Sequence, residues 1–267
     1  MQLDHLNIEH DIIKMYRKDI WSRFVKGLKT FKMIDDNDKI AVAISGGKDS
    51  FLMAKLFQEL TKHPMVDFEV VFVMMDPGYS KENLHKIQKT SERLGIPLNI
   101  EPYHVFKVIN NIAKDDPCYL CARMRRGFLY SVAEKYGCNK LALGHHYDDV
   151  IETTLLNLFY TGSFKTMLPK IKSRNFEGIT LIRPMYFIKE KSIIKIMEKN
   201  NVDAIDCGCA VAAKEVESKR AEIKTLIETL KTINPEIDKS IFRAAANVHL
   251  DHIISWKKSG IRYHFDE

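Results

Sequence analysis

The hydrophobic residues of this chain follow two alternating spacings. Apolar runs with the length of a buried strand occupy residues 41–44, 68–75, 98–101 and 140–143. Hydrophobic residues three or four positions apart, the helical period, occupy residues 10–33, 51–60, 81–94, 122–136 and 148–160. Strands that alternate with helices predict a parallel sheet with right-handed crossovers, so the expected fold class is a doubly wound α/β domain.

Beyond residue 185 the pattern becomes mainly helical. Helices are predicted at residues 190–199, 215–231 and 235–249, with a cysteine-bearing loop between the first two. We therefore expect three segments: an N-terminal helical segment at 1–35, the α/β domain at 36–185, and a C-terminal helical extension at 186–267.

Composition narrows the class of protein. The 267 residues are 45% hydrophobic, enough for one large domain with an appendage, and the net charge of +6 is compatible with a nucleic-acid partner. The first ten residues are polar and no apolar run reaches the thickness of a bilayer, so we expect no membrane association and a cytoplasmic protein. Thiols stay reduced in that compartment, so the five cysteines are candidate ligands, catalysts or core residues.

The loop Ser45-Gly46-Gly47-Lys48-Asp49-Ser50 follows the first predicted strand and leads into a helix. Glycines let backbone N–H groups approach an anion, and the positive end of the following helix points toward the same place. The spacing differs from that of a Walker A loop. Ser-Gly-Gly-x-Asp-Ser resembles instead the PP-loop of the ATP pyrophosphatases, which implies adenylation of a carbonyl oxygen with release of pyrophosphate.

Further polar residues are predicted at the same edge of the sheet. Ligands of doubly wound sheets lie beyond the carboxyl ends of the strands, which brings the turn at Asp76 and the segment starting at Gly144 beside the glycine loop. Asp148 and Asp149 then form a carboxylate pair that suits Mg²⁺ or the orientation of a base. Asp148 is also a good helix N-cap, whereas Asp149 has no such structural reason.

The cysteines form two groups. Cys118 and Cys121 make a C-x-x-C just before a helix, which suits zinc, a redox dithiol or an iron–sulfur cluster. Cys207 and Cys209 can complete that site. Four ligands favour closed tetrahedral zinc, and three favour a [4Fe–4S] cluster with one open iron; the crowding of a C-x-C pair on one ion favours three. Cys138 is predicted to be a core residue.

Several motifs together resemble one family. They are Ile44 to Ser50, Pro117-Cys118-x-x-Cys121 followed by Arg125-Arg126-Gly127, Gly144-His145-His146-x-Asp148-Asp149-x-x-Glu152-Thr153, Asn157-Leu158-Phe159-Tyr160, and Ile182-Arg183-Pro184. In this order and spacing they closely resemble the TtcA-like tRNA 2-thiolation enzymes, over about residues 15–250.

The resemblance implies an enzyme that uses ATP to activate the 2-oxo group of a tRNA pyrimidine and replaces that oxygen with sulfur. It also implies a [4Fe–4S] cluster held by Cys118, Cys121 and one of Cys207 or Cys209. Counted from Arg183-Pro184, Cys207 aligns better, but the sequence departs here from the C-x-x-C-Gly-Ser of the family, so Cys209 stays an alternative. No cysteine lies outside 118–209, so the zinc fingers of uridine-modifying relatives are missing and cytidine 32 of the anticodon loop is the expected target.

The hypothesis assigns the following roles. The ATP phosphates are bound by Ser45, Gly46, Gly47, Lys48 and Ser50. The backbone around Met74 to Asp76 and near Gly144 holds adenine and ribose, with Asp149 placing the pyrimidine or its Mg²⁺. Catalysis is assigned to Lys48, Asp49, Asp149 and Arg125. The expected partners are tRNA, a sulfur donor such as a cysteine desulfurase or sulfide, and a second copy of the chain in a homodimer.

Three alternatives stay open. A thiouridine-forming tRNA sulfurtransferase shares the same superfamily. A lysidine-synthase-like or amidotransferase-like enzyme shares the glycine loop but has no need of the cysteines. A zinc-stabilised RNA- or nucleotide-binding protein without catalysis would use all four cysteines as ligands.

Overall fold

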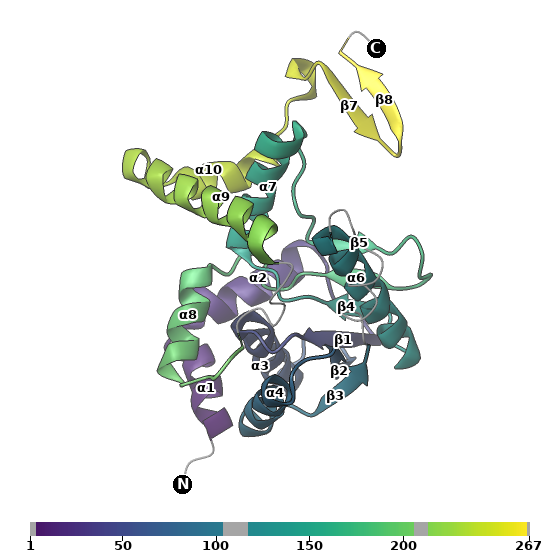
Figure 1. Ribbon diagram of the computed structural model, residues 1–267, viewed down its shortest axis with the longest axis vertical. Coiled ribbons are helices and arrows are strands. Elements are labelled where there is room, and N and C mark those ends of the chain that lie inside the picture. Colours follow the sequence, from purple (N-terminus) through teal and green to yellow (C-terminus); the bar gives the residue numbers. More distant parts are fainter. Residues whose placement is uncertain (1–3, 104–116, 206–212, 266–267) are drawn as a thin grey trace. The chain divides into compact units, whose positions relative to one another are not determined.

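The computed structural model describes residues 4–103, 117–205 and 213–265. In these residues the main sheet has the strand order β3-β2-β1-β4-β6-β5, with β5 antiparallel and the other strands parallel (Figure 1). The strands are β1 (Asp38–Ile44), β2 (Phe68–Asp76), β3 (Leu98–Pro102), β4 (Lys140–Ala142), β5 (Lys170–Lys172) and β6 (Thr180–Ile182). The sequence did not predict β5 and β6, which have three residues each.

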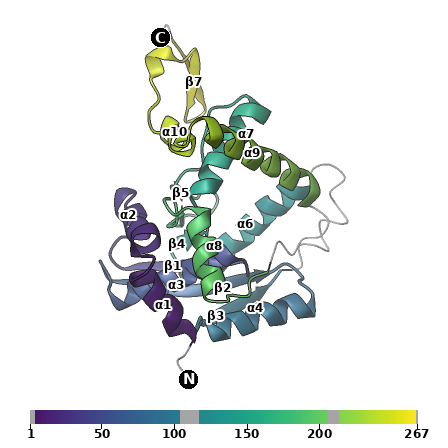
Figure 2. The same cartoon turned by 90° about the vertical axis from the view of Figure 1, so that its left-hand side faces the viewer.

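Helices cover both faces of this sheet (Figures 1 and 2). They include α1 (Asp4–Ile13), α2 (Ser22–Thr30), α3 (Lys48–Lys62), α4 (Lys81–Arg93), α6 (Pro117–Lys135) and α8 (Glu190–Lys199). Residues of β1 alternate between the faces: Val42 packs in one core cluster with α1, α2, α3, α4 and α8, and Ala41 in the other with α6. The predicted doubly wound α/β class is confirmed.

The N-terminal helix predicted over 10–33 is interrupted. α1 ends at Ile13, a π-helical turn spans Arg17–Trp21, and α2 starts at Ser22. The N–H of Tyr16 donates to the carbonyl of Asp11, five positions back, at 2.8 Å. The apolar period continues through this wider turn, because the residues on both sides of it bury their side chains in the same core. Hydrophobic spacing alone therefore does not detect the break.

The C-terminal prediction needs a second correction. The helix expected over 235–249 is α10 (Ile237–Ala244), and a hairpin of β7 (Ser255–Lys258) and β8 (Ile261–His264) lies beyond it. Ser259 and Gly260 connect the strands with positive φ angles of 53° and 88°. A two-residue Ser-Gly loop with two positive φ angles is typical of tight hairpins, so the dipeptide was the available signal.

Contacts divide the chain into two compact units. The first comprises Met1–Asp149 and Leu168–Lys219, and the second Val150–Met167 and Arg220–Glu267. The helices α7 (Tyr147–Thr161) and α9 (Ala213–Ile233) contribute to both. These boundaries differ from the segments 1–35, 36–185 and 186–267, which stay a prediction. Within the described residues, no helix is long and apolar enough to cross a membrane.

The strand order defines the place of a ligand site. The chain runs from β1 outward to β2 and β3, then returns to place β4 on the other side of β1. The connections after β1 and β4 therefore leave the sheet in opposite directions and open a crevice between them. Nucleotides bind at such switch points in doubly wound sheets.

Candidate active site

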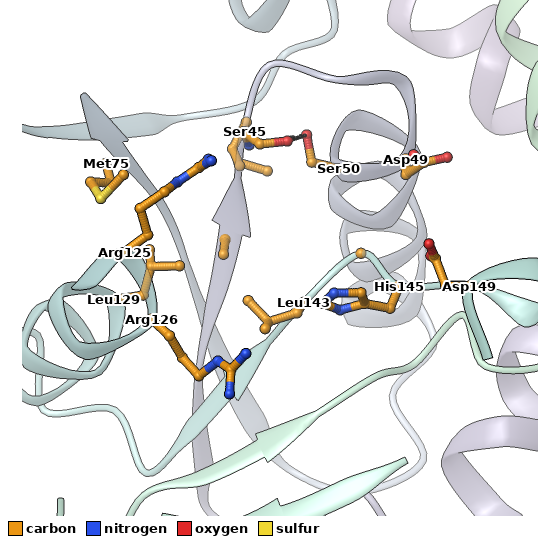
Figure 3. A pocket seen from close by; sticks show the side chains of 13 residues that line it. Ser45, Asp49, Ser50, Met75, Arg125, Arg126, Leu129, Leu143, His145 and Asp149 are labelled. Atoms are coloured by element: carbon orange, nitrogen blue, oxygen red, sulfur yellow. Dashed lines mark hydrogen bonds between the residues drawn. The ribbon is translucent and has the colours of Figure 1, made fainter. Parts of the chain in front are cut away.

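A cavity of about 390 Å³ lies at this switch point, within the range of small-molecule sites (Figure 3). Elements far apart in the sequence line it: the end of β1 and the start of α3, the end of β2, one face of α6, and the connection from β4 to α7. The polar and basic lining residues are Ser45, Asp49, Ser50, Arg125, Arg126, His145 and Asp149. Arg125 and Arg126 lie across the cavity from Asp49 and Asp149 (Figure 3).

The glycine loop is held in shape by one serine. The Oγ of Ser50 donates to the carbonyl of Gly47 at 2.8 Å and accepts from the N–H of Ser45 at 3.1 Å and from the hydroxyl of Ser45 at 3.2 Å. These bonds use the full capacity of the Ser50 hydroxyl. Ser50 therefore fixes the loop in this arrangement, and its predicted phosphate contact would require breaking one of these bonds. The Ser45 hydroxyl also accepts a long 3.4 Å bond from the N–H of Gly47.

Two glycines of the site differ in how much space their neighbours leave for a side chain. Gly46 has a φ of +84°, and a Cβ there would lie 2.7 Å from the side chain of Ile87 and 3.0 Å from that of Ile205. A Cβ on Gly144 would lie 3.4 Å from the backbone of Asp49 and of Ser50. Gly144 was predicted to allow the approach of a nucleotide; it lines the cavity, and it also packs against the start of α3.

Lys48 points its ammonium at two carboxylates. Its Nζ lies 3.1 Å from Oε1 of Glu190 and 3.4 Å from Oδ2 of Asp49. Burial lowers the pKa of Lys48, but the charges of Asp49 and Glu190 outweigh this effect, so the pKa lies above its ordinary value. Lys48 starts α3, and Glu190 starts α8. The sequence analysis missed Glu190, because a glutamate in the first turn of a helix is common and carries no signal of a distant partner.

Three aspartates surround a buried imidazole. The Nε2 of His146 lies 3.5 Å from Oδ2 of Asp149 and 3.9 Å from Oδ1 of Asp49, and its Nδ1 lies 3.8 Å from Oδ2 of Asp148. Burial raises the pKa of Asp49, and the nearby charges of His146 and Lys48 oppose this shift. Oδ1 of Asp49 is buried and has no hydrogen-bond partner among the described residues, so it can accept a ligand.

The roles expected for the paired aspartates change. Asp148 is inside α7 rather than at its N-cap, and its Oδ2 accepts the N–H of Glu190 at 2.6 Å, which caps α8. Oδ2 of Asp149 accepts the N–H of His146 at 2.9 Å, as the third residue of a capping box does. Asp149 therefore caps the start of α7, a structural role that the sequence analysis did not predict, and it also lines the cavity.

Basic residues form the opposite wall. Arg125 and Arg126 come from α6 and line the cavity. Arg183, which follows β6, is not a lining residue, but its charge interacts with that of Arg126. Arg183 is 6% exposed, and its Nη1 donates to the carbonyl of Leu168. Burial, with the positive charge of Arg126, lowers the pKa of Arg183 to about 10, which leaves the guanidinium of Arg183 charged at neutral pH. This wall suits a polyanion.

The prediction for β2 concerned the backbone around Met74 to Asp76, and the side chains of this segment have separate roles. Met74 is fully buried in the hydrophobic core, and Met75, the next residue, lines the cavity instead. Asp76 accepts the N–H groups of Gly78 and Tyr79, both at 2.9 Å, and so shapes the turn before α4. A contact of this strand with adenine would therefore come from Met75 or from backbone groups.

The cysteine site lies largely outside the described residues. Cys207 and Cys209 are not described, and Cys118 and Cys121 begin α6 with side chains outside the described part. Positions 118, 121 and 125 follow one stripe of that helix, and Arg125 lines the cavity. The N–H of Ile205, two positions before Cys207, donates to the carbonyl of Gly46 at 3.0 Å.

Two further observations concern metals and thiols. Among the described residues, no group of three His, Cys, Asp or Glu side chains is arranged to hold a metal ion. Cys138 is buried in the core against α6, as predicted, and is a free thiol. Burial raises the pKa of this thiol to about 11.

A glycine loop after the first strand of a parallel sheet, opening into a polar cavity at the switch point, defines a PP-loop nucleotide-binding protein. The sequence profile of the PP-loop domain family matches residues 19–206. The tRNA-cytidine(32) 2-sulfurtransferase of Citrifermentans bemidjiense is 38% identical over 238 residues, covering 88% of this chain and 92% of that protein. The protein of the same name from Pelobacter propionicus is 37% identical and covers 88% of each chain.

A solved structure agrees with these relatives. The U34-tRNA thiolase NcsA from Methanococcus maripaludis, with its [4Fe-4S] cluster, superposes with a TM-score of 0.69 at 26% identity, over 87% of this chain and 79% of that one. This chain therefore belongs to the PP-loop family and, within it, to the family of the tRNA-cytidine(32) 2-sulfurtransferases. The resemblance to the TtcA-like enzymes is confirmed.

Proposed function

We propose that this protein is an ATP-dependent tRNA sulfurtransferase that replaces the 2-oxo oxygen of cytidine 32 with sulfur. The observation that carries the proposal is the match of nearly the whole chain to relatives of that name, combined with a cavity that opens at the switch point beside the glycine loop. The relatives supply the reaction class, and the geometry supplies a place for ATP.

The residues around the cavity suit a nucleotide. The N-terminus of α3, a helix of 15 residues, ends at the cavity and attracts phosphate. Arg125 and Arg126 add positive charge on the opposite wall, and Lys48 can leave its carboxylate partners for the α-phosphate. Gly46 and Gly47 leave space for backbone N–H contacts to the phosphates. Near Asp49 and Asp149 the cavity has room for the base that is to be activated.

The proposed first step adenylates the base. The 2-oxo oxygen of the cytosine attacks the α-phosphorus of ATP, a P–O bond breaks, and pyrophosphate leaves with its electron pair. Lys48 and Arg125 stabilise the charge that accumulates on the phosphates, and Asp49 and Asp149 orient the base. In the second step a sulfide equivalent attacks C2, the C2–O bond breaks, and AMP leaves. Water must stay out of the cavity between the steps, because it would return the adenylate to cytidine.

The chain carries candidate ligands for the two inorganic groups that this chemistry implies. Cys118, Cys121 and either Cys207 or Cys209 would hold a [4Fe–4S] cluster, which supplies an iron able to carry the transferred sulfur. The stripe from position 118 to Arg125 and the contact of Ile205 with Gly46 support that placement. The unpartnered Oδ1 of Asp49 would hold Mg²⁺, which neutralises phosphate charge.

Other parts of the proposal rest on the reaction class. The polynucleotide partner is tRNA through its anticodon loop, the sulfur comes from a cysteine desulfurase or from sulfide, and the compartment is the cytoplasm. A homodimer is the proposed assembly, and light scattering of the purified protein tests it.

Nucleoside mass spectrometry of tRNA from a strain lacking this gene tests the function. We expect 2-thiocytidine to disappear and to return when the wild-type gene is supplied, but not when the supplied gene carries Lys48→Ala. An unchanged level of 2-thiocytidine and of all thiouridines in the deletion strain would contradict the proposal.

A thiouridine-forming enzyme is the second candidate, supported by the superposition on the U34-tRNA thiolase. Loss of a thiouridine with retention of 2-thiocytidine would favour it. The zinc-stabilised binding protein is tested by anaerobic purification: colourless protein that contains zinc would support it, whereas broad absorption in the blue supports the iron–sulfur enzyme.

A further inference from the structure

The C-terminal hairpin of the second unit carries three exposed cations, Lys257, Lys258 and Arg262. β7 and β8 pair through four residue pairs, and the rings of Trp256 and Tyr263 stack across the strands with centroids 5.7 Å apart and planes at 12°. An isolated two-stranded ribbon is marginally stable in water, so this aromatic pair is its main internal support. The tight turn Ser259-Gly260 fixes the register.

The cross-strand pair next to Trp256 and Tyr263 brings two positive charges together. Lys257 lies directly opposite Arg262, and both side chains are exposed. Lys258, also exposed, follows at once. Like charges directly opposite each other destabilise a ribbon. Among the described residues, none of these three cations has an ion-pair partner, in contrast to the nearby Lys239, which pairs with Glu236.

The surrounding sequence adds charge of the same sign. From Lys239 to Phe265 the chain carries five lysines and arginines against one acidic residue, Asp251. The hairpin also exposes apolar surface, because Ile261 and Phe265 are 59% and 71% exposed. Ile261 pairs with Lys258, so these two side chains share one face of the ribbon, and Lys257 and Arg262 lie on the other face. Unneutralised cations next to exposed aromatic and aliphatic side chains match the chemistry of a single-stranded nucleic acid, whose phosphates and base faces alternate.

We propose that the β7–β8 hairpin is an RNA-binding surface, in which Lys257, Lys258 and Arg262 contact phosphates of the tRNA substrate. This inference rests on the proposed function for the identity of the RNA. A polyanion removes the repulsion between Lys257 and Arg262, so binding and hairpin stability are coupled. The hairpin would contribute affinity without taking part in the chemistry at the cavity.

The test compares two triple variants of the full-length, anaerobically purified protein. The first carries Lys257→Gln, Lys258→Gln and Arg262→Gln. The control carries Lys89→Gln, Lys172→Gln and Arg174→Gln, which removes the same charges from exposed positions elsewhere. Binding of an unmodified tRNA transcript with cytidine at position 32 is measured without ATP over a series of salt concentrations. Thiolation of the same transcript is then measured at varied tRNA concentration.

We expect the hairpin variant to bind the tRNA transcript at least about tenfold more weakly at low salt. The magnitude of the slope of log affinity against log salt concentration should fall by about 2 to 3, because each lost phosphate contact removes about 0.7 to 0.9 from that slope. The KM for tRNA should rise while kcat is kept, and the melting temperature should not fall, because like-charge repulsion is relieved. The control variant should behave as the wild type does.

The proposal is overturned if the hairpin variant matches the control in affinity, salt slope and KM. It is also overturned if the hairpin cations are needed only for binding to vesicles that contain phosphatidylserine, with tRNA affinity unchanged, because the surface then recognises lipid. A wild-type protein that binds the transcript through these cations but forms no 2-thiocytidine would refute the proposed function while the binding surface stands.

Discussion

The ammonium of Lys48 lies 3.1 Å from Oε1 of Glu190, although 142 positions separate the two residues in the chain. Lys48 begins α3 and Glu190 begins α8, so the pair joins the start of the helix after the glycine loop to the start of a helix from the late part of the chain. Asp148 secures the second helix by accepting the N–H of Glu190. Under the proposed function, ATP phosphates and Glu190 compete for the same ammonium.

Glu190→Gln removes that competition. We expect the KM for ATP to fall about two- to fivefold, because a factor of that size corresponds to the free energy of a partly exposed ion pair. The kcat should change less than threefold. Glu190→Asp, which keeps the charge, is the matched control, and pyrophosphate release in the steady state is the measurement. A higher KM together with a lower kcat would mean instead that Glu190 holds the ammonium in its productive position.

Lys48→Ala tests the adenylation scheme itself. Formation of 2-thiocytidine should fall at least about 100-fold, as expected when one charge-stabilising group is removed from the reacting phosphate. The iron content and visible absorption should stay at the wild-type level, because Lys48 is not in either cysteine segment. Lys89→Ala, at an exposed position of α4, is the control. A fully active Lys48→Ala enzyme would refute the scheme.

The two glycines of the loop should respond differently to an added methyl group. Gly46→Ala should lower the free energy of unfolding by about 1 to 3 kcal/mol, because its φ is +84° and its Cβ would meet Ile87 and Ile205. Gly47→Ala should cost less than about 1 kcal/mol, since its φ is −82° and the nearest atom to a Cβ is 3.6 Å away. Urea unfolding compares them, and equal costs would contradict this explanation.

A buried ion pair predicts a pH-dependent stability. Glu9 accepts hydrogen bonds from Lys55 at 2.6 Å and from Lys62. Burial raises the pKa of Glu9, but these two ammonium groups outweigh it, so the pKa lies below its ordinary value of 4.5. The contribution of Glu9 to stability is therefore complete above pH 4.5 and is lost as the pH falls through the lowered pKa.

Glu9→Gln should accordingly reduce the free energy of unfolding by about 3 kcal/mol at pH 7, because it leaves the 1% exposed ammonium of Lys55 without a carboxylate. The difference from the wild type should shrink in acid. Glu69→Gln, which removes an exposed partner of Lys39, is the control and should change stability by less than about 1 kcal/mol. A pH-independent difference would assign the loss to packing.

The thiol of Cys138 should react very slowly with alkylating reagents in the folded protein. With a pKa raised from 9.0 to about 11, its thiolate fraction at pH 8 is about 100-fold smaller than that of an unperturbed cysteine. The rate at which iodoacetamide alkylates Cys138, followed by peptide mass spectrometry, should therefore be at least about 100-fold lower in buffer than in urea. Equal rates in the two solvents would show that this thiol is accessible and ionised in the native state.

The sequence by itself determined the fold class and the position of the candidate nucleotide site. Alternating strand and helix periods indicate a parallel sheet, and the rule for switch points then places the glycine loop beside Gly144 and Asp149, where the cavity lies. These signals are local, because each depends on hydrophobic spacing or on backbone freedom within a few residues. The resemblance to the sulfurtransferase family was likewise contained in the order of short motifs.

The tertiary structure decided which atoms meet. Glu190 reaches Lys48, Asp149 caps its own helix, and Gly46 must be glycine because Ile87 and Ile205 occupy the space of a Cβ. Each of these contacts joins groups from different elements or depends on where a helix begins. Hydrophobic periodicity along the chain does not predict such contacts, because they form only when the sheet and its helices have packed against each other.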